Sequence, residues 1–89
     1  MPTGVPRAGD TKFEVLAAVM DHWSGARYGP TVGELATTVG LSARSTAQFH
    51  INDLLDDGYL VHVEGKPRTL SVTKKGKKLV TVVRQLETM

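Results

Sequence analysis

The sequence has no cysteine among its 89 residues, and this absence excludes disulfide bonds, cysteine-based zinc sites and a thiol nucleophile. Long apolar runs are also missing, so the sequence predicts no membrane-spanning segment. Residues 1–10 lack the apolar core of a signal peptide, and their Gly and Pro content predicts a flexible N-terminal arm instead. These absences are compatible with a cytoplasmic protein.

The sequence also has little that could carry catalysis. The histidines at 22, 50 and 62 are far apart and do not have the spacing of metal ligands. The glycines fall in predicted turns and form no phosphate-binding loop. Asp56 and Asp57 end a predicted helix, where we expect them to face solvent rather than to act as a general acid/base pair. We therefore expect no enzyme, no catalytic residue, no cofactor and no metal site.

Charge is distributed unevenly along a chain whose net charge is only +2. Residues 1–64 hold four Lys or Arg and eight Asp or Glu, whereas residues 65–89 hold seven Lys or Arg and one Glu. A basic last third on an otherwise acidic domain indicates a local contact with a polyanion. The alternative is an ordinary solvated helix face. With 40% hydrophobic residues, the chain is long enough for one small globular domain.

The first helix is predicted to begin at Thr11, where Thr11 and Glu14 have the spacing of a capping box. Apolar residues then recur at helical spacing, and residues 24–30 form a loop. The apolar face of this helix consists of Phe13, Leu16, Ala17, Met20 and Trp23.

Two further helices follow closely. The second begins with another capping box, formed by Thr31 and Glu34, and ends at Gly40. The third begins after Ser42, which is placed to cap it, and runs to about Asp57. Its predicted inward residues are Ala47, Ile51 and Leu54.

After Gly58 the hydrophobic pattern changes from helical to alternating, which is typical of strands. Residues 59–64 and 69–72 are predicted strands, joined by a basic turn over 65–68. From Thr73 the pattern becomes helical again. We therefore expect a small α+β domain of three helices, a β-hairpin and a C-terminal helix.

These elements resemble a known family. The stretch LATTVGLSARSTAQFHINDLLDDGYLV resembles the winged helix-turn-helix domains of bacterial transcription regulators, with Ala36 at the close helix contact and Gly40 in the turn. LSVTKKGKKL is similar to the step from the wing to the next helix in regulators of the MarR and PadR types. The nearest similarity, from Tyr28 to Val72, is to the N-terminal domains of the LexA repressors. The resemblance implies binding to double-stranded DNA.

The chain departs from the LexA pattern in two ways. No autocleavage domain is expected, because the sequence ends at Met89, and the helix from Thr73 is additional. The predicted organisation is thus an arm over 1–10, a winged helix-turn-helix domain over 11–72 and a C-terminal helix over 73–89.

The third helix supplies the predicted base-reading residues, because the N-terminal part of such a helix enters the major groove. Gln48 can pair with adenine, and Arg44 with guanine or a phosphate. For Phe49, partial burial against a neighbouring helix is slightly favoured over contact with a thymine methyl group. The predicted readout set is Arg44, Ser45, Thr46, Gln48 and Phe49.

Contacts to the DNA backbone are predicted at helix N termini, at the wing and directly after it. An ordinary polar turn and a solvated helix face are the alternatives for the wing and the lysines, and a surface or core role is the alternative for Asn52. The predicted backbone set is Thr31, Ser42, Asn52, Lys66, Arg68, Lys74 and Lys75.

The C-terminal helix carries an apolar stripe at the spacing of a coiled-coil seam, formed by Leu79, Val82, Val83 and Leu86. This stripe predicts either a homodimer contact or packing onto the first helix. We expect a cytoplasmic, nucleoid-associated regulator of bacterial or phage origin that binds double-stranded DNA as a homodimer, most simply a repressor. The alternatives are a winged helix that binds a protein partner, and a phage or plasmid replication or architectural protein.

Overall fold

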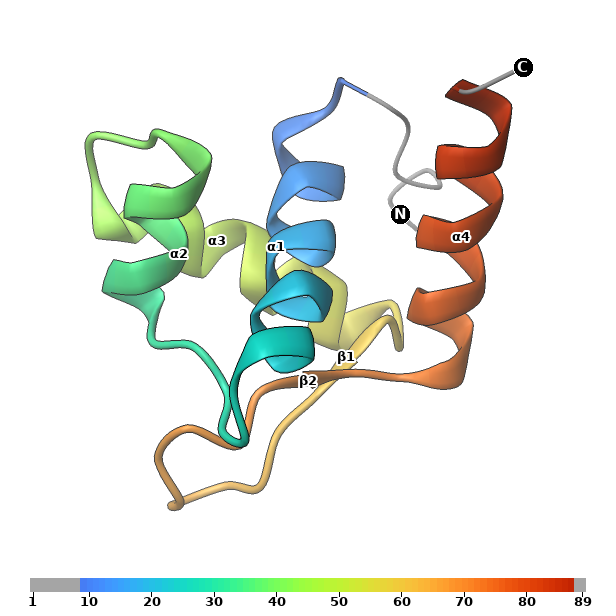
Figure 1. The fold of residues 1–89 in the computed structure, drawn as a ribbon. Coiled ribbons are helices and arrows are strands. Elements are labelled where there is room, and N and C mark those ends of the chain that lie inside the picture. The colour runs from blue at the N-terminus through green and yellow to red at the C-terminus, as the bar shows by residue number, and fades with distance from the viewer. Residues whose placement is uncertain (1–8, 88–89) are drawn as a thin grey trace.

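The computed structural model describes residues 9–87, which fold as four helices and one two-stranded antiparallel hairpin (Figure 1). The elements are α1 (Thr11–Gly25), α2 (Val32–Val39), α3 (Arg44–Asp56), β1 (Leu60–Val61), β2 (Ser71–Val72) and α4 (Lys74–Glu87). The predicted α+β fold and its order of elements are confirmed. Residues 1–8 and 88–89 lie outside the described part, and so does most of the predicted N-terminal arm.

The first predicted capping box is wrong by one residue. The N-cap of α1 is Asp10, and its carbonyl oxygen accepts a hydrogen bond from the backbone N–H of Glu14 at 3.0 Å. Thr11 already lies inside the helix, so its hydroxyl is not in the position of a cap. The shift places Phe13, rather than Glu14, three residues after the cap. Phe13 has no side-chain oxygen that could accept a hydrogen bond from the backbone N–H of the N-cap residue.

The start of α2 matches the prediction. The Thr31 hydroxyl accepts from the backbone N–H of Glu34 at 3.1 Å, and Glu34 Oε1 accepts from the backbone N–H of Thr31 at 2.8 Å. Gly40 ends the helix with φ +81°, a left-handed conformation that glycine adopts without steric cost. Both ends of this short helix are therefore closed by local hydrogen bonds.

The start of α3 differs from the prediction. Its N-cap is Ala43, which has an extended backbone, and no side chain of the described residues caps the helix there. Ser42 lies one residue too early to bond the first turn, so the predicted cap is wrong. The predicted end is correct, since Gly58 follows the helix in a left-handed conformation with φ +81°.

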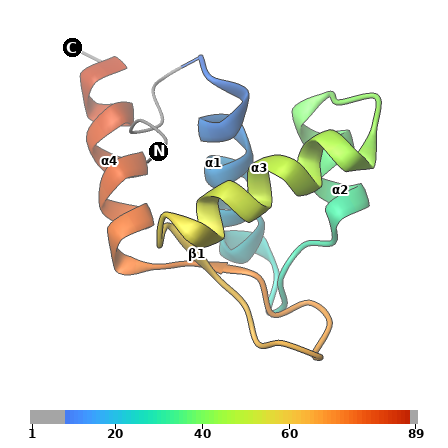
Figure 2. The ribbon, with the colours of Figure 1, turned by 180° about the vertical axis from the view of Figure 1, so that it is seen from behind.

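The core is built around α1, which contacts α2, α3, β2 and α4. The predicted inward residues of α3 are confirmed, because Ala47, Ile51 and Leu54 are all buried. Figure 2 shows α3 crossing α1 on one side of the molecule, while α4 stands beside α1 on the side away from α2. The fully buried large side chains are Leu16, Leu35, Leu54, Val15, Val19 and Val80.

The hairpin forms as predicted, but its strands are shorter. Only two pairs are in register, Leu60 with Val72 and Val61 with Ser71. Nearer the tip, the Thr69 hydroxyl accepts from the backbone N–H of Val63 at 2.9 Å and takes the place of a strand pair. Pro67 has no N–H to donate and Arg68 has a positive φ of 58°, so a regular ladder cannot continue through this segment.

The apolar stripe of α4 divides into two parts. Val80 is fully buried, and Leu79 and Val83 pack against the core formed with α1. Val82 and Leu86 remain 43% and 65% exposed. The helix therefore completes the core and also leaves an apolar strip at the surface. None of the helices within residues 9–87 is long and apolar enough to cross a membrane.

Candidate nucleic-acid interface

The side of α3 that faces away from the core is polar and open. Its exposed residues include four of the five predicted readout residues, together with Asn52. Figure 2 shows α3 on the near side, with no other helix in front of it. The exposed residues on this side are Ser45, Thr46, Gln48, Phe49 and Asn52, with Asp56 at the C-terminal end of the helix. A single helix with a free polar face of this kind fits the major groove of B-DNA.

Gln48 and Asn52 are linked one helical turn apart. The amide nitrogen of Gln48 donates to Oδ1 of Asn52 at 2.8 Å. This bond uses one of the two N–H groups of Gln48 and leaves its carbonyl oxygen and second N–H, which are the pair that adenine requires. Asn52, expected at the DNA backbone, thus lies beside the main readout residue and orients it.

Phe49 is 55% exposed. Its ring makes an edge-on contact with the ring of the neighbouring His50, with 5.6 Å between the ring centres. The favoured interpretation of partial burial against a neighbouring helix is wrong, because Phe49 is exposed and no helix within residues 9–87 covers this side of α3. Contact with a thymine methyl group remains the other interpretation.

Arg44 begins α3 and lies over the start of α2. A Cβ atom at Gly33 would be 3.1 Å from the Arg44 Nε atom, so the missing side chain makes room for the guanidinium. Sequence reasoning did not single out Gly33, although a glycine in the first turn of a helix is an unfavourable choice that calls for a packing reason. Arg44 is exposed, and its guanidinium lies beside the first turn of α2.

A groove separates α3 from the wing and gathers residues from both. Gln48 and Asn52 line it from α3, and Lys66 and Arg68 line it from the wing. His62 also lines this groove, although the sequence pattern gave it no role beyond its place in a strand. The structure therefore brings predicted readout and backbone residues together on one surface.

Arg68 points back toward α2. Its Nη1 atom lies 3.0 Å from Glu34 Oε1, and its guanidinium carbon lies 4.8 Å from the centre of the Tyr28 ring. The hydrogen bond from the backbone N–H of Thr31 is the main cause that lowers the pKa of the Glu34 carboxyl. Desolvation opposes it, and the charge of Arg68 lowers the pKa further. Glu34 is therefore an ionised partner at neutral pH.

The comparison with known proteins decides the family. The family model described as the LexA DNA binding domain matches residues 10–69. The chain belongs to the LexA DNA-binding domain family. The resemblance to winged helix-turn-helix regulators is thereby confirmed, and β2 and α4 lie beyond the matched segment.

Individual relatives agree with this assignment. The chain is 39% identical over 69 residues to the LexA repressor of Lactobacillus acidophilus, covering 76% of this chain and 33% of that protein. It is 40% identical over 73 residues to the LexA repressor of Limosilactobacillus fermentum, covering 81% of this chain and 35% of that protein. The chain thus spans about a third of the length of the curated relatives that it matches.

The lysines that follow the wing of this LexA-type domain differ in their surroundings. Lys75 donates to the backbone carbonyl of Asp57 at 2.7 Å and lies 4.5 Å from the centre of the Tyr59 ring. It therefore binds the C-terminal end of α3, where a cation is favoured by the helix dipole. Lys74 is exposed. A half-buried cation that the sequence did not reveal, Lys12, also binds this end of α3 through Asp57 at 3.2 Å.

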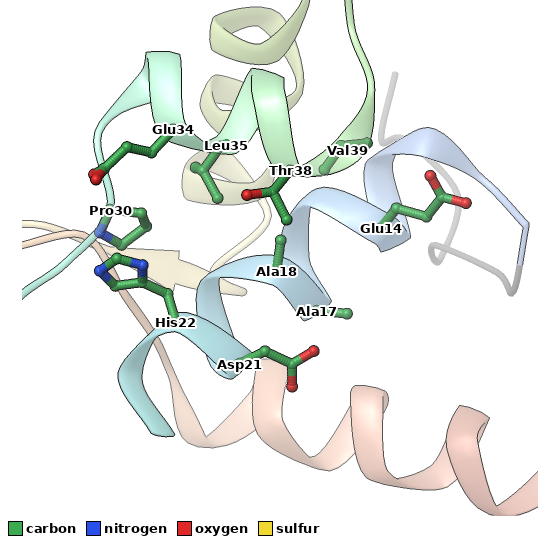
Figure 3. A pocket seen from close by; sticks show the side chains of 10 residues that line it. All are labelled: Glu14, Ala17, Ala18, Asp21, His22, Pro30, Glu34, Leu35, Thr38 and Val39. Carbon is green, nitrogen blue, oxygen red and sulfur yellow. The ribbon is translucent and has the colours of Figure 1, made fainter. Parts of the chain in front are cut away.

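A second groove, which is acidic, is bordered by α1 and α2 of the LexA-type domain (Figure 3). Glu14, Asp21 and Glu34 surround a floor that includes Ala17 and Ala18. Asp21 also holds Arg84 of α4 at 2.8 Å, and this hydrogen bond raises the pKa of Arg84 above its ordinary value. Carboxylates repel phosphates, so this groove is an unfavourable place for DNA. Within residues 9–87, no group of three His, Cys, Asp or Glu is placed to hold a metal ion.

Proposed function

We propose that this LexA-type domain recognises a specific double-stranded DNA sequence and represses transcription by occluding promoter DNA. The observation that carries the proposal is the open polar face of α3, which no other helix covers in Figure 2. The family assignment and the LexA repressor relatives support the same function. A repressor of this kind acts in the cytoplasm, on the nucleoid.

In this proposal α3 lies in the major groove and its first two turns read bases. Gln48, oriented by Asn52, pairs with adenine, and Arg44 pairs with guanine or a flanking phosphate. Ser45 and Thr46 donate to base edges, and the exposed ring of Phe49 contacts a thymine methyl group.

Contacts to phosphates come from the edges of this surface. Lys66 at the wing tip and Lys74 at the start of α4 are exposed, and Thr31 and Ser42 precede the N termini of two helices. Lys75 contributes only when it leaves the Asp57 carbonyl oxygen. These contacts set the position of the domain on DNA but do not select a sequence.

Pairing of two copies through α4 would present two α3 helices to DNA. The exposed Val82 and Leu86, next to the half-buried Leu79 and Val83, offer an apolar strip for a second α4. Leu86→Ser should shift the full chain toward monomer in sedimentation velocity without loss of helical structure, because this side chain is 65% exposed. An unchanged sedimentation coefficient would reject α4 as the dimer contact.

The test of the function is selection of bound sequences from a random duplex pool with the full chain. We expect a motif with two half-sites about one helical turn apart. Gln48→Ala and Thr46→Ala should relax the preference at individual bases, each at about 1–3 kcal/mol. Thr38→Ala is the matched control, because Thr38 is an exposed threonine of the acidic groove.

Selection of no sequence would reject the proposal, as would weak binding that disappears as salt rises. A protein-interaction module would then be the better interpretation, and the acidic groove between α1 and α2 would be its available surface.

A further inference from the structure

The base of the wing is tied to the loop between α1 and α2 by the backbone. The N–H of Gly29 donates to the carbonyl oxygen of Arg68 at 2.7 Å, and the indole N–H of Trp23 donates to the carbonyl oxygen of Leu70 at 2.7 Å. A Cβ atom at Gly29 would lie 2.6 Å from the Leu70 carbonyl oxygen, so only glycine allows this approach. The returning segment of the wing is thus fixed at two points.

The side chain of Arg68 adds a third point. Its Nη1 atom is 3.0 Å from Glu34 Oε1 and 3.5 Å from the carbonyl oxygen of Gly29, and its guanidinium lies over the Tyr28 ring. The backbone of Arg68 has φ +58°, a conformation that residues other than glycine rarely adopt. Such a conformation persists where the surrounding contacts determine it.

Glu34 is itself held in place. The same Oε1 atom that binds Arg68 accepts the backbone N–H of Thr31 at the start of α2. A carboxylate fixed by the capping box loses little further freedom when it binds a cation. A phosphate that recruited Arg68 would have to displace this carboxylate and would then lie near an unpaired negative charge.

From these contacts we propose that Tyr28, Glu34 and Arg68 form a latch that fixes the wing relative to α3, so that Arg68 positions the wing rather than contacting phosphate. The latch joins the wing to α2, and α2 packs directly on α3. It therefore sets where Lys66 lies across the groove from Gln48. This inference rests on the proposed DNA-binding function.

The test is a double-mutant cycle on the selected DNA, with the dissociation constant of the full chain measured by fluorescence anisotropy across a salt series. Lys66→Gln removes the wing-tip charge. Glu34→Gln removes the charge of the latch but keeps an oxygen that can accept the Thr31 N–H. In the wild type, Lys66→Gln should weaken binding and lower the salt slope by about one.

In the Glu34→Gln background, the loss of affinity caused by Lys66→Gln should shrink by about threefold or more, because an unlatched wing no longer places Lys66 on the backbone. Removal of the Glu34 charge also raises the affinity for DNA in a general way. This gain cancels in the cycle, because it is present both with and without Lys66→Gln. Glu14→Gln is the matched control, since Glu14 is another exposed carboxylate of the acidic groove and is not part of the latch. In that background Lys66→Gln should keep its full effect.

An undiminished effect of Lys66→Gln in Glu34→Gln would overturn the latch. So would a further loss of affinity when Arg68→Gln is added to Glu34→Gln, because that result is expected of a phosphate contact. If Glu34→Gln fails to fold, Arg68→Lys replaces it: the latch predicts a reduced effect of Lys66→Gln, and a simple phosphate contact predicts a full one. A wild type without sequence preference would reject the proposed function itself, and the latch with it.

Discussion

The helices α2 and α3 follow each other in the chain and both bury apolar residues against α1, but their N termini are built differently. At the start of α2 the Thr31 hydroxyl accepts the backbone N–H of Glu34, and the Glu34 carboxylate accepts the backbone N–H of Thr31 and places a negative charge there. The first N–H groups of α3 follow Ala43, and no side chain of the described residues caps them. The start of α2 is thus satisfied locally, whereas the start of α3, the helix proposed to enter the major groove, leaves donors and positive potential for phosphate.

The largest losses of stability should come from core substitutions, and they should be similar in α2 and α3 because both helices bury apolar residues against α1. Leu35→Ala in α2 and Leu54→Ala in α3 each remove a side chain that is 1% or less exposed. Each should lower the free energy of unfolding by about 2–5 kcal/mol, because each leaves a cavity. Urea unfolding followed by circular dichroism measures both. Phe49→Ala is the exposed control on α3 and should stay within about 0.5 kcal/mol of the wild type.

A smaller effect should separate the two helix starts. Thr31→Ala removes the cap of α2 and should lower the free energy of unfolding by about 1 kcal/mol. Ser42→Ala should change it by less than about 0.5 kcal/mol, because Ser42 does not cap α3. Thermal melting of the two variants side by side makes the comparison. Equal losses would mean that Ser42 caps α3 in solution and that the contrast between the two helix starts does not hold.

An N-cap side chain added to α3, like the one that α2 has, should remove the difference between the two helix starts. Ala43→Ser supplies a hydroxyl at the N-cap and should raise the free energy of unfolding by about 0.5–1 kcal/mol. Ala43→Asp should stabilise the fold similarly but weaken DNA binding, because its charge would occupy the end of the helix where phosphate is proposed to bind. Melting curves and anisotropy titrations of both variants provide the measurement. Unchanged DNA affinity in Ala43→Asp would argue against a phosphate at this helix end.

The smallest effect concerns pH and is specific to α2. The pKa of Glu34 is lowered in the folded protein from an ordinary value of 4.5, so its ionised form stabilises the fold. This contribution is fully present above about pH 4.5 and is lost as pH falls through the lowered pKa. The stability difference between the wild type and Glu34→Gln should therefore shrink on acidification across that range. A difference that stays constant down to the acid transition would contradict the assigned cause.

How far the sequence predicts this structure depends on whether a feature is local. The α2 capping box and the inward face of α3 are local patterns, and both were predicted correctly from residues a few positions apart. The caps at Asp10 and Ala43 were missed because a shift of one residue in backbone conformation leaves the hydrophobic period unchanged. The exposure of Phe49 was missed because periodicity does not show which side of a helix lacks a neighbour.

The surroundings of Arg68 could not be predicted from local patterns. Its partners, Tyr28 and Glu34, are distant in sequence and meet it only when the hairpin folds back on the loop before α2. The basic turn was visible in the sequence, but its cations looked equivalent. The fold separates them, leaving Lys66 exposed at the tip and turning Arg68 toward α2.

The hydrogen bond from Trp23 to the Leu70 carbonyl oxygen also gives this domain an intrinsic optical reporter. Trp23 is the only tryptophan in the sequence, and its indole N–H donates to the wing at 2.7 Å. Any movement of the wing away from the helices breaks this bond and hydrates the indole, which shifts the emission of the whole protein to longer wavelength. The fluorescence emission of Trp23 therefore reports the position of the wing without an added label.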